Sequence, residues 1–592
     1  MPRNLRQPET AAAAGLLAVA GWIYWPALHG GWIWDDYMYI PQNQALRSLA
    51  GLSSIWLAPS GVNYFPVTST VQWVQWHLWG DATFGYHLTN LALHLLNCLL
   101  VGRLIGSLAV GGRDTESDHG ALAPMGLAGW VAALLFAVHP LAVESVAWIS
   151  ELKNVLSLAF LLGAIIAYIH YEKDASAQAG GRCRLYYAFS WLLFVLAMLS
   201  KSTVALFPAV ILLFGWWKRG RVRRADLLAA LPFGIAALGL GLVTVWFEHH
   251  RATAILDATP ESLAARTGVA ALDVAFYLSK SVIPWGLMPN YPLWSAVRMP
   301  ALQFVPLAAL GALTAGLRMK HPAWGRAAIF GWGCFLLNLA PVLGWIPMAY
   351  QRISPVADHF AYLSLVAVVG LAAAGWSAGA NRTAIDAAAP TWFRRRPILA
   401  GLLLLTASAL ALESRLYAQV YRGGEAFWSY AAERNPDSWA AQSNLGLILA
   451  QTGRVTAALA RYENALRLKP DDAGAHSNIG NLLGAEPGRE ADAIAHFESA
   501  LRLNPDLAGA HNNLGLLLAS QPGREADAIA HFESALRLQP NSYFVHYNLA
   551  QVLAKSRATR ENAARHYAAA LEINPDFAPA REALEEMRRT DH

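Results

Sequence analysis

The sequence predicts an all-α protein in two parts: a polytopic membrane helix bundle of about eleven spans, followed by an α-solenoid of repeated helix pairs. Of the 592 residues, 55% are hydrophobic and only 14% are charged, a composition typical of a membrane protein with a soluble appendage. Apolar runs near the spanning length of ~20 residues recur up to about residue 413. Beyond about residue 423 a repeat replaces them, so we expect domains at 1–422 and 423–592.

The apolar runs are expected to be membrane helices. They cover, in chain order, residues 11–28, 86–106, 124–141, 154–171, 185–200, 203–217, 227–247, 301–317, 327–347, 360–378 and 397–413. Lys and Arg gather in alternate connections, which places those connections inside. The alternation holds only if 267–283 does not cross and forms an interfacial or re-entrant helix on the outer side. Asp35, Asp36 and the C-terminal repeats are then all outside.

Charge and cysteine content exclude some partners. The net charge is only +5, and the basic residues are spread over short connections, so no nucleic-acid partner is expected. Two of the three cysteines lie inside apolar runs and one lies in a connection, which argues against a disulfide framework.

Two adjacent carboxylates, Asp35 and Asp36, follow the first apolar run and lie between aromatic residues. At the depth where a membrane meets water, such a group can take a proton from a hydroxyl or hold a cation. Asp35 is the first candidate for a general base and Asp36 the second. The alternative interpretation is a solvated loop start.

Three basic residues in the outer connections, Lys153, Lys201 and Arg352, are candidates to bind a donor phosphate. Charged groups near apolar runs are costly unless they are paired or functional, and all three are expected on the same side as Asp35. Each also fits an interfacial position, with its carbon chain in lipid and its charge in water.

Further residues on that side are candidates to line a sugar pocket. Glu144 can orient a sugar or pair with Lys201, or it can be a helix-start residue favoured by the helix dipole. Asp358 and His359 either line the pocket or cap the span that follows them.

One face of the second apolar run carries polar residues at helical spacing, namely His87, Asn90, His94 and Asn97. His87 and Asn90, which are nearest the outer side, are candidates to line the pocket. The alternative is that all four side chains hydrogen-bond to neighbouring helices.

The C-terminal part repeats first after 34 and then after 35 residues. Proline marks the period at Pro436, Pro470, Pro505, Pro540 and Pro575. Each unit contains Asn followed by Leu or Ile and a small residue, and then an Ala-rich second helix. This is the tetratricopeptide helix–turn–helix pattern. We expect four full units, a preceding half unit from residue 423 and a final capping helix over 578–589.

A solenoid of this kind has a concave groove. Asn444, Asn478, Asn513 and Asn548 recur at one position, so they are expected to form a ladder that binds the backbone of an extended acceptor peptide. The alternative is that they bond only neighbouring repeats. Repeat-spaced histidines also occur, and no metal is assigned to them.

Three segments, taken in order, resemble the membrane-embedded protein O-mannosyltransferases that carry tetratricopeptide repeats, and more closely their bacterial relatives. They are residues 34–36 with 86–94, residues 137–148 and residues 357–363, which read Trp-Asp-Asp with Tyr-His-Leu-Thr-Asn-Leu-Ala-Leu-His, Ala-Val-His-Pro-Leu-Ala-Val-Glu-Ser-Val-Ala-Trp, and Ala-Asp-His-Phe-Ala-Tyr-Leu. The match runs through most of residues 30–375, and the repeats extend it.

The resemblance implies a GT-C-like glycosyltransferase that takes its sugar from a polyprenyl-phosphate carrier. A single displacement at the anomeric carbon inverts its configuration and needs no nucleophile from the enzyme. No cofactor is expected; a divalent cation is possible at the carboxylates but not favoured, because no second set of hard ligands appears. In two places the chain departs from the family, since Leu152 and His359 stand where relatives usually have arginine.

The predicted function is transfer of a sugar, mannose by resemblance, to Ser or Thr hydroxyls of exported proteins, with the repeats binding the acceptor. A second hypothesis is a catalytically inert, membrane-anchored scaffold for protein–protein interaction, and a third keeps the enzyme but gives it a lipid or glycan acceptor. The expected location is a bacterial inner membrane, with the active site and repeats on the periplasmic face.

Overall fold

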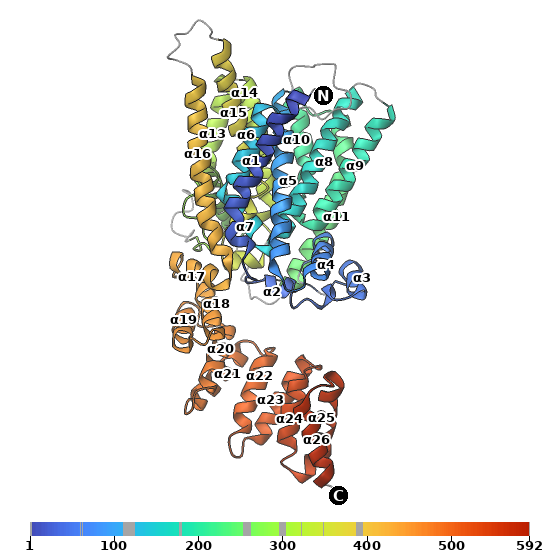
Figure 1. Ribbon diagram of the computed structural model, residues 1–592, viewed down its shortest axis with the longest axis vertical. Helices are drawn as coiled ribbons and strands as arrows, with labels where there is room; N and C mark the ends of the chain where they lie inside the picture. Colours follow the sequence, from blue (N-terminus) through green and yellow to red (C-terminus); the bar gives the residue numbers. More distant parts are fainter. Residues whose placement is uncertain are drawn as a thin grey trace. The chain divides into compact units, whose positions relative to one another are not determined.

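The computed structural model describes residues 3–590 except 60, 62, 111–124, 177–179, 253–261, 295–303, 321, 347 and 386–394. In that part of the chain every regular element is a helix and no strand occurs, which confirms the all-α prediction. The chain divides into two compact units, Met1–Tyr430 and Ala431–His592 (Figure 1). The division lies after the expected boundary at 422 because Phe427 and Trp428 pack against Trp34 of the first unit.

The first unit, here called the membrane unit, contains long helices joined by short helical turns (Figure 1). Each apolar run expected to span lies largely in a helix. The helices are α1 (Arg3–Leu28), α2 (Asp36–Tyr39), α3 (Leu49–Leu57), α4 (Pro66–Trp79), α5 (Thr83–Val110), α6 (Gly126–Val138), α7 (Val143–Ala147), α8 (Leu152–Ser176), α9 (Gly180–Ser200), α10 (Phe207–Arg219), α11 (Arg224–Phe247), α12 (Leu263–Val282), α13 (Val305–Lys320), α14 (Pro322–Leu339), α15 (Leu365–Ile385), α16 (Arg395–Ala418) and α17 (Gly424–Arg434).

By length and composition, seven helices among the described residues can cross a membrane. An eighth span results if α6 and the bent segment Pro140–Ala147 are counted as one. The expected number of eleven is therefore not confirmed. The three remaining candidates are short: α10 has 13 residues, α13 has 16, and the apolar part of α15 is confined to Leu365–Ala378. The protein is an integral membrane protein, and spanning by these three helices stays a prediction.

The polar residues of the outer connections gather at one end of the membrane unit. The helices α2 and α4 lie at that end, opposite the N-terminus (Figure 1). The chain bends by 61° between α6 and Pro140–Ala147. Proline lacks a backbone N–H and so interrupts a helix, and His139 caps the new turn by accepting a hydrogen bond from the Leu141 N–H at 3.2 Å. The bend carries Glu144 and the following residues inward, where they are buried.

The second unit is the expected solenoid of antiparallel helix pairs. Its helices are α18 (Trp439–Gln451), α19 (Val455–Leu468), α20 (Ala473–Gly484), α21 (Glu490–Leu503), α22 (Ala508–Ala519), α23 (Glu525–Leu538), α24 (Tyr543–Leu553), α25 (Arg560–Ile573) and α26 (Ala578–Thr590). Small residues allow the helices of a pair to approach. A Cβ at Gly480 would lie 3.0 Å from the Phe497 ring, and one at Gly515 would lie 2.9 Å from the Phe532 ring.

Candidate functional site

The two adjacent carboxylates have different surroundings. Asp36 is fully buried, and its two oxygens accept hydrogen bonds from the backbone N–H groups of Ile33 at 2.9 Å and Ser150 at 2.8 Å. Asp35 is only partly buried, and its Oδ1 accepts a hydrogen bond from the Ser150 hydroxyl at 2.8 Å. Burial raises the pKa of both carboxyl groups, and the neighbouring Asp35 raises that of Asp36 further. Asp36 therefore ties two segments together, while Asp35 is the carboxylate that a substrate can reach.

The backbone at Trp34 sets the direction of these carboxylates. Its φ is +47°, a left-handed conformation that costs a bulky residue about 1–3 kcal/mol. Ring packing holds it there: the Trp34 indole stacks on Trp148 with centroids 5.5 Å apart and meets Trp428 edge-on at 5.0 Å. Aromatic pairs in these arrangements each contribute about 0.5–1.5 kcal/mol.

Two lysines share one buried glutamate close to Asp35. Glu151 lies 2.8 Å from the Lys153 ammonium and 3.5 Å from that of Lys201. Lys201 is only 7% exposed and also donates to Asn154 Oδ1 at 2.6 Å. Two ammonium groups face one carboxylate, and the closer contact is the one to Lys153. Burial lowers the pKa of Lys201 to about 8.

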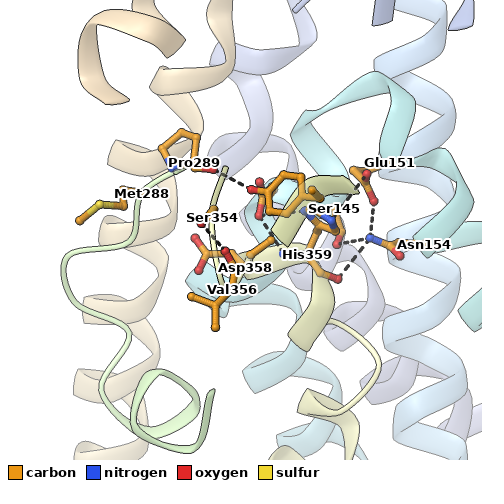
Figure 2. Close-up of polar contacts among 12 residues, drawn as sticks. Ser145, Glu151, Asn154, Met288, Pro289, Ser354, Val356, Asp358 and His359 are labelled. Atoms are coloured by element: carbon orange, nitrogen blue, oxygen red, sulfur yellow. Dashed lines mark hydrogen bonds and ion pairs between the residues drawn. The ribbon is translucent and has the colours of Figure 1, made fainter. Parts of the chain in front are cut away.

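His359 connects this charged group to Glu144. Its backbone N–H donates to Glu144 Oε2 at 2.8 Å, and its Nε2 lies 3.9 Å from Glu151 (Figure 2). The amide of Asn154 donates to Ser145, to Glu151 and to the backbone carbonyl of His359 (Figure 2). His359 thus lies between two acidic side chains.

Asp358 is turned toward tyrosines and not toward the lysines. Its two oxygens accept hydrogen bonds from the hydroxyls of Tyr291 at 2.8 Å and Tyr417 at 2.9 Å. Tyr291 also donates its backbone N–H to Ser354, which is drawn beside Asp358 in Figure 2. Burial raises the pKa of Asp358, and Glu144 raises it further. The geometry makes Asp358 a tie between three segments of the membrane unit.

The polar face of α5 bonds its neighbours. Asn90 donates to the carbonyls of Trp148 at 3.0 Å and Ile149 at 3.4 Å, and Asn97 donates to the Val155 carbonyl at 2.8 Å. His87 is buried on the same helix. Asn90 thereby fixes the backbone that leads directly into Ser150, so it acts on the carboxylates through that residue.

Arg352 ends the 3₁₀ turn Ala349–Arg352 and is partly buried. Tyr350 in the same turn packs edge-on against His359 with ring centroids 5.6 Å apart, which places this turn beside the charged group. The Arg352 guanidinium makes no ion pair with any residue that the structure describes.

Two cavities of different character meet near Lys201. A polar one of about 10 Å³, room for about one water molecule, is lined by Asn154, Lys201 and His359. An apolar one of about 190 Å³ is lined by residues of α5, α8, α10, α14 and α15. Three residues line both cavities, Leu158, Asn338 and Leu363. The apolar cavity therefore adjoins the polar one.

Among the described residues, no group of three His, Cys, Asp or Glu side chains is placed to hold a metal ion. Asp35 and Asp36 accept hydrogen bonds from protein donors. Metal independence stays a prediction.

In the second unit the asparagines form a chain of side-chain bonds across repeats. Asn548 donates to Asn512 at 2.9 Å, Asn512 donates to Asn513 at 2.9 Å, and Asn513 donates to Asn481 at 2.6 Å. Asn444 instead donates to a carbonyl of its own helix, and Asn478 lies next to the Tyr462 hydroxyl. These side chains thus have neighbours within the protein, in line with the alternative interpretation, and the peptide-binding ladder stays a prediction.

Sequence reasoning missed three residues that hold the site together. No pattern singles out Ser150, although it bonds both aspartates. Glu151 pairs with two lysines. The one local sign of this in the sequence is that Glu151 stands two residues before Lys153. Tyr417 lies near the end of α16, and no local pattern marks it as a partner of Asp358.

The chain is similar to named protein O-mannosyl-transferases. It is 24% identical over 525 residues to protein O-mannosyl-transferase Tmtc3 of Drosophila melanogaster, covering 77% of this chain and 55% of that protein. It is 26% identical over 497 residues to protein O-mannosyl-transferase TMTC4 of Mus musculus, covering 73% of this chain and 63% of that protein. The chain therefore spans a little over half the length of these curated relatives. The resemblance expected from the motifs is confirmed.

The repeats are matched separately. Residues 446–485 match the family described as TPR repeat, and residues 488–543 match the family described as Tetratricopeptide repeat. Among solved structures, that of YrrB, a TPR protein with an unusual peptide-binding site, is similar at 23% identity with a TM-score of 0.24, covering 31% of this chain and 87% of that one. The predicted repeat type is confirmed by the family matches.

Proposed function

We propose that this chain, a relative of the tetratricopeptide-repeat protein O-mannosyl-transferases, is a membrane glycosyltransferase that moves mannose from a polyprenyl-phosphate carrier to Ser or Thr hydroxyls of exported proteins. The observation that carries the proposal is the pair of cavities that share walls. The apolar space suits part of a polyprenyl chain, and Lys201, in the polar space beside it, supplies a cation for the phosphate of that chain.

The unequal contacts of the two lysines favour an anion beside Lys201. Lys153 takes the close contact to Glu151 at 2.8 Å, whereas Lys201 has no carboxylate oxygen nearer than 3.5 Å among the described residues. A phosphate that binds Lys201 competes with Glu151, whose contact to that ammonium is already long at 3.5 Å. Arg352 is the third cation that can bind the phosphate. As the sugar leaves, these groups stabilise the negative charge that develops on the departing phosphate.

Asp35 is the base in this proposal. The acceptor oxygen attacks the anomeric carbon, its proton passes to the Asp35 carboxylate, and the bond between the sugar and the phosphate breaks to release polyprenyl phosphate. The raised pKa of Asp35 makes its carboxylate a stronger proton acceptor than an exposed one. One displacement inverts the configuration at carbon. Glu144 and His359 orient the sugar from the other side of the charged group.

The repeats bind the acceptor protein in this proposal. Asn512, Asn513 and Asn548 exchange hydrogen bonds between their side-chain amides, and an extended peptide can replace those partners with its own backbone groups. We place the active site and the repeats on the periplasmic side of a bacterial inner membrane, because the basic connections alternate as described above.

The test uses the full chain, purified in detergent, with mannosyl polyprenyl phosphate and a Thr-containing peptide. The Asp35→Asn variant, which keeps the shape and removes the base, should lower transfer by about 10²–10⁴-fold. The matched control, Asp36→Asn, should instead lower the temperature of unfolding, because Asp36 accepts two buried backbone hydrogen bonds. Transfer at the wild-type rate by a folded Asp35→Asn protein would remove the proposed base.

A catalytically inert scaffold is the second candidate. It is favoured by Leu152 and His359, which stand where the family usually has arginine. A scaffold predicts that the wild-type protein captures partners and shows no turnover of the donor under any condition. Measurable transfer that depends on Lys201 excludes it.

A further inference from the structure

A second polar cavity lies beside Asp35. It has a volume of about 70 Å³ and is lined by residues of the first outer connection, together with Ser150 and Lys153. Among the described residues, none lines both this cavity and the polar cavity of Lys201. The Glu151 carboxylate contacts both Lys153 and Lys201, one from each cavity, so it forms the partition between them.

The lining of this cavity suits a ligand rich in hydrogen-bonding groups. Lys153 is its one charged side chain among the described residues, and Glu151 pairs with that ammonium at 2.8 Å. Among the described residues, no carboxylate lines it. Gln72, on α4, is only 4% exposed and has no hydrogen-bond partner in the described part of the chain, so its amide can bind a ligand's donor and acceptor groups. Tyr39 and Asn63 bond each other at 2.9 Å and present polar edges. A lipid chain placed here would leave these groups unpaired at a cost.

Ser150 is the cavity residue that touches the carboxylates. Its hydroxyl donates to Asp35 Oδ1 at 2.8 Å, and its backbone N–H donates to Asp36 at 2.8 Å. A hydroxyl bound in the cavity against Ser150 therefore lies next to the proposed base. The donor phosphate, held by Lys201, lies across the Glu151 partition.

We propose that this cavity is the acceptor site and that it takes the Ser or Thr side chain of an extended polypeptide segment, with Gln72 binding the peptide backbone. The inference rests on the proposed function, because it names where the second substrate of that reaction sits. In the proposed complex the sugar lies beside Glu151, so that the acceptor oxygen enters from the Ser150 side as the phosphate oxygen leaves toward Lys201.

A kinetic test separates the two substrates. Gln72→Leu keeps the side-chain volume and removes the amide, so it should raise the KM for the acceptor peptide by about tenfold and leave the KM for the lipid donor unchanged. Gln75→Leu is the matched control, because Gln75 is also buried on α4 but does not line the cavity. It should leave the acceptor KM unchanged. An unchanged acceptor KM in Gln72→Leu, or a raised donor KM, overturns the proposal.

A binding test is independent of turnover. An acceptor peptide with a photoreactive residue next to its Thr is crosslinked to the full chain without donor, and the products are mapped by mass spectrometry. Crosslinks to Tyr39, Asn63 or Gln72 support the site even if no transfer is found, in which case only the proposed reaction falls. Crosslinks that avoid this cavity in a protein that does transfer mannose overturn the site and leave the reaction standing.

Discussion

Lys201 is the residue whose surroundings best suit the binding of an anion. Its ammonium is buried, bonds the neutral Asn154 at 2.6 Å and lies 3.5 Å from Glu151. Lys153 takes the shorter contact to the same carboxylate at 2.8 Å. Burial opposes the charged form, which is why the pKa of Lys201 falls to about 8 in spite of Glu151. A bound phosphate would raise the pKa of Lys201 again and so keep its ammonium charged.

This balance predicts the alkaline limb of the pH profile. Above about pH 8 the Lys201 ammonium loses its proton, so the KM for the lipid donor should rise. In Lys201→Arg the guanidinium stays charged, and the rise should disappear even if the maximal rate is lower. Steady-state kinetics on both sides of pH 8 checks this. The same alkaline rise in both proteins would show that another group titrates.

Among the secondary-structure elements, the segment from the end of α16 into α17 packs against the residues directly before Asp35 and Asp36. The Gly31 N–H donates to the Arg422 carbonyl at 3.1 Å. Gly30 is required there, because a Cβ would lie 2.7 Å from the Tyr421 carbonyl oxygen. Trp428 then packs on Trp34, directly before the carboxylates. No local sequence pattern indicates this chain of contacts.

Trp428→Ala should therefore release Trp34 from its left-handed conformation and misplace Asp35. We expect kcat to fall at least tenfold with the donor KM unchanged, since Lys201 is untouched. Trp428→Phe, which keeps a ring, should recover most of the rate. Trp285→Ala is the control, because that indole is 73% exposed. Equal kcat values for Trp428→Ala and the wild type would contradict the positioning role.

In the repeats, three histidine pairs join the first helix of a repeat to its second helix. The Nδ1 atoms lie 3.1 Å apart in His476–His496, and 2.9 Å apart in both His511–His531 and His546–His566. Burial lowers the pKa of His496, His531 and His566, and the partner histidine lowers it further. A hydrogen bond between two imidazole nitrogens needs one ring to donate and the other to accept, so protonation of the accepting nitrogen breaks it.

The sign of the pH effect follows from the lowered pKa values. As the pH falls, His496, His531 and His566 take up protons near pH ~6.5 in the unfolded chain, but only at a lower pH in the folded chain. Their contribution to the free energy of unfolding is therefore present above that pH and is lost as the pH falls. The protection of α20–α25 against hydrogen exchange in the full chain, corrected for the intrinsic exchange rate at each pH, should therefore be lower about one pH unit below this value than one unit above it. Replacing His496, His531 and His566 by Gln should flatten this difference. An unaltered difference in the triple variant would assign it to other groups.

For the molecule as a whole, the proposal requires the first outer connection and the repeats to face the same compartment. Single cysteines are placed at Leu57, which is 85% exposed, and at the exposed Glu490, in a chain whose native cysteines are replaced. A membrane-impermeant maleimide added to intact cells should label both and spare a cysteine at Arg221, which lies in a basic connection. Labelling of only one of the first two positions would refute the shared compartment.

The amino-acid sequence alone was enough to predict the helical class, the position of the apolar helices, the repeat and the resemblance to O-mannosyltransferases. Each of these depends on local periodicity or on short motifs. The sequence also pointed to Asp35, Lys201 and Glu144 as separate candidates. It could not show how they are related, because Ser150 reaches Asp36 across 114 positions of the chain and Lys201 reaches Asn154 across 47.

The three-dimensional structure was needed to show which of two adjacent carboxylates is reachable, that Glu151 separates two polar cavities, and that Asp358 is tied to tyrosines. These contacts join segments far apart in the chain. Their geometry follows from how the helices pack against one another, and no spacing along the sequence encodes it.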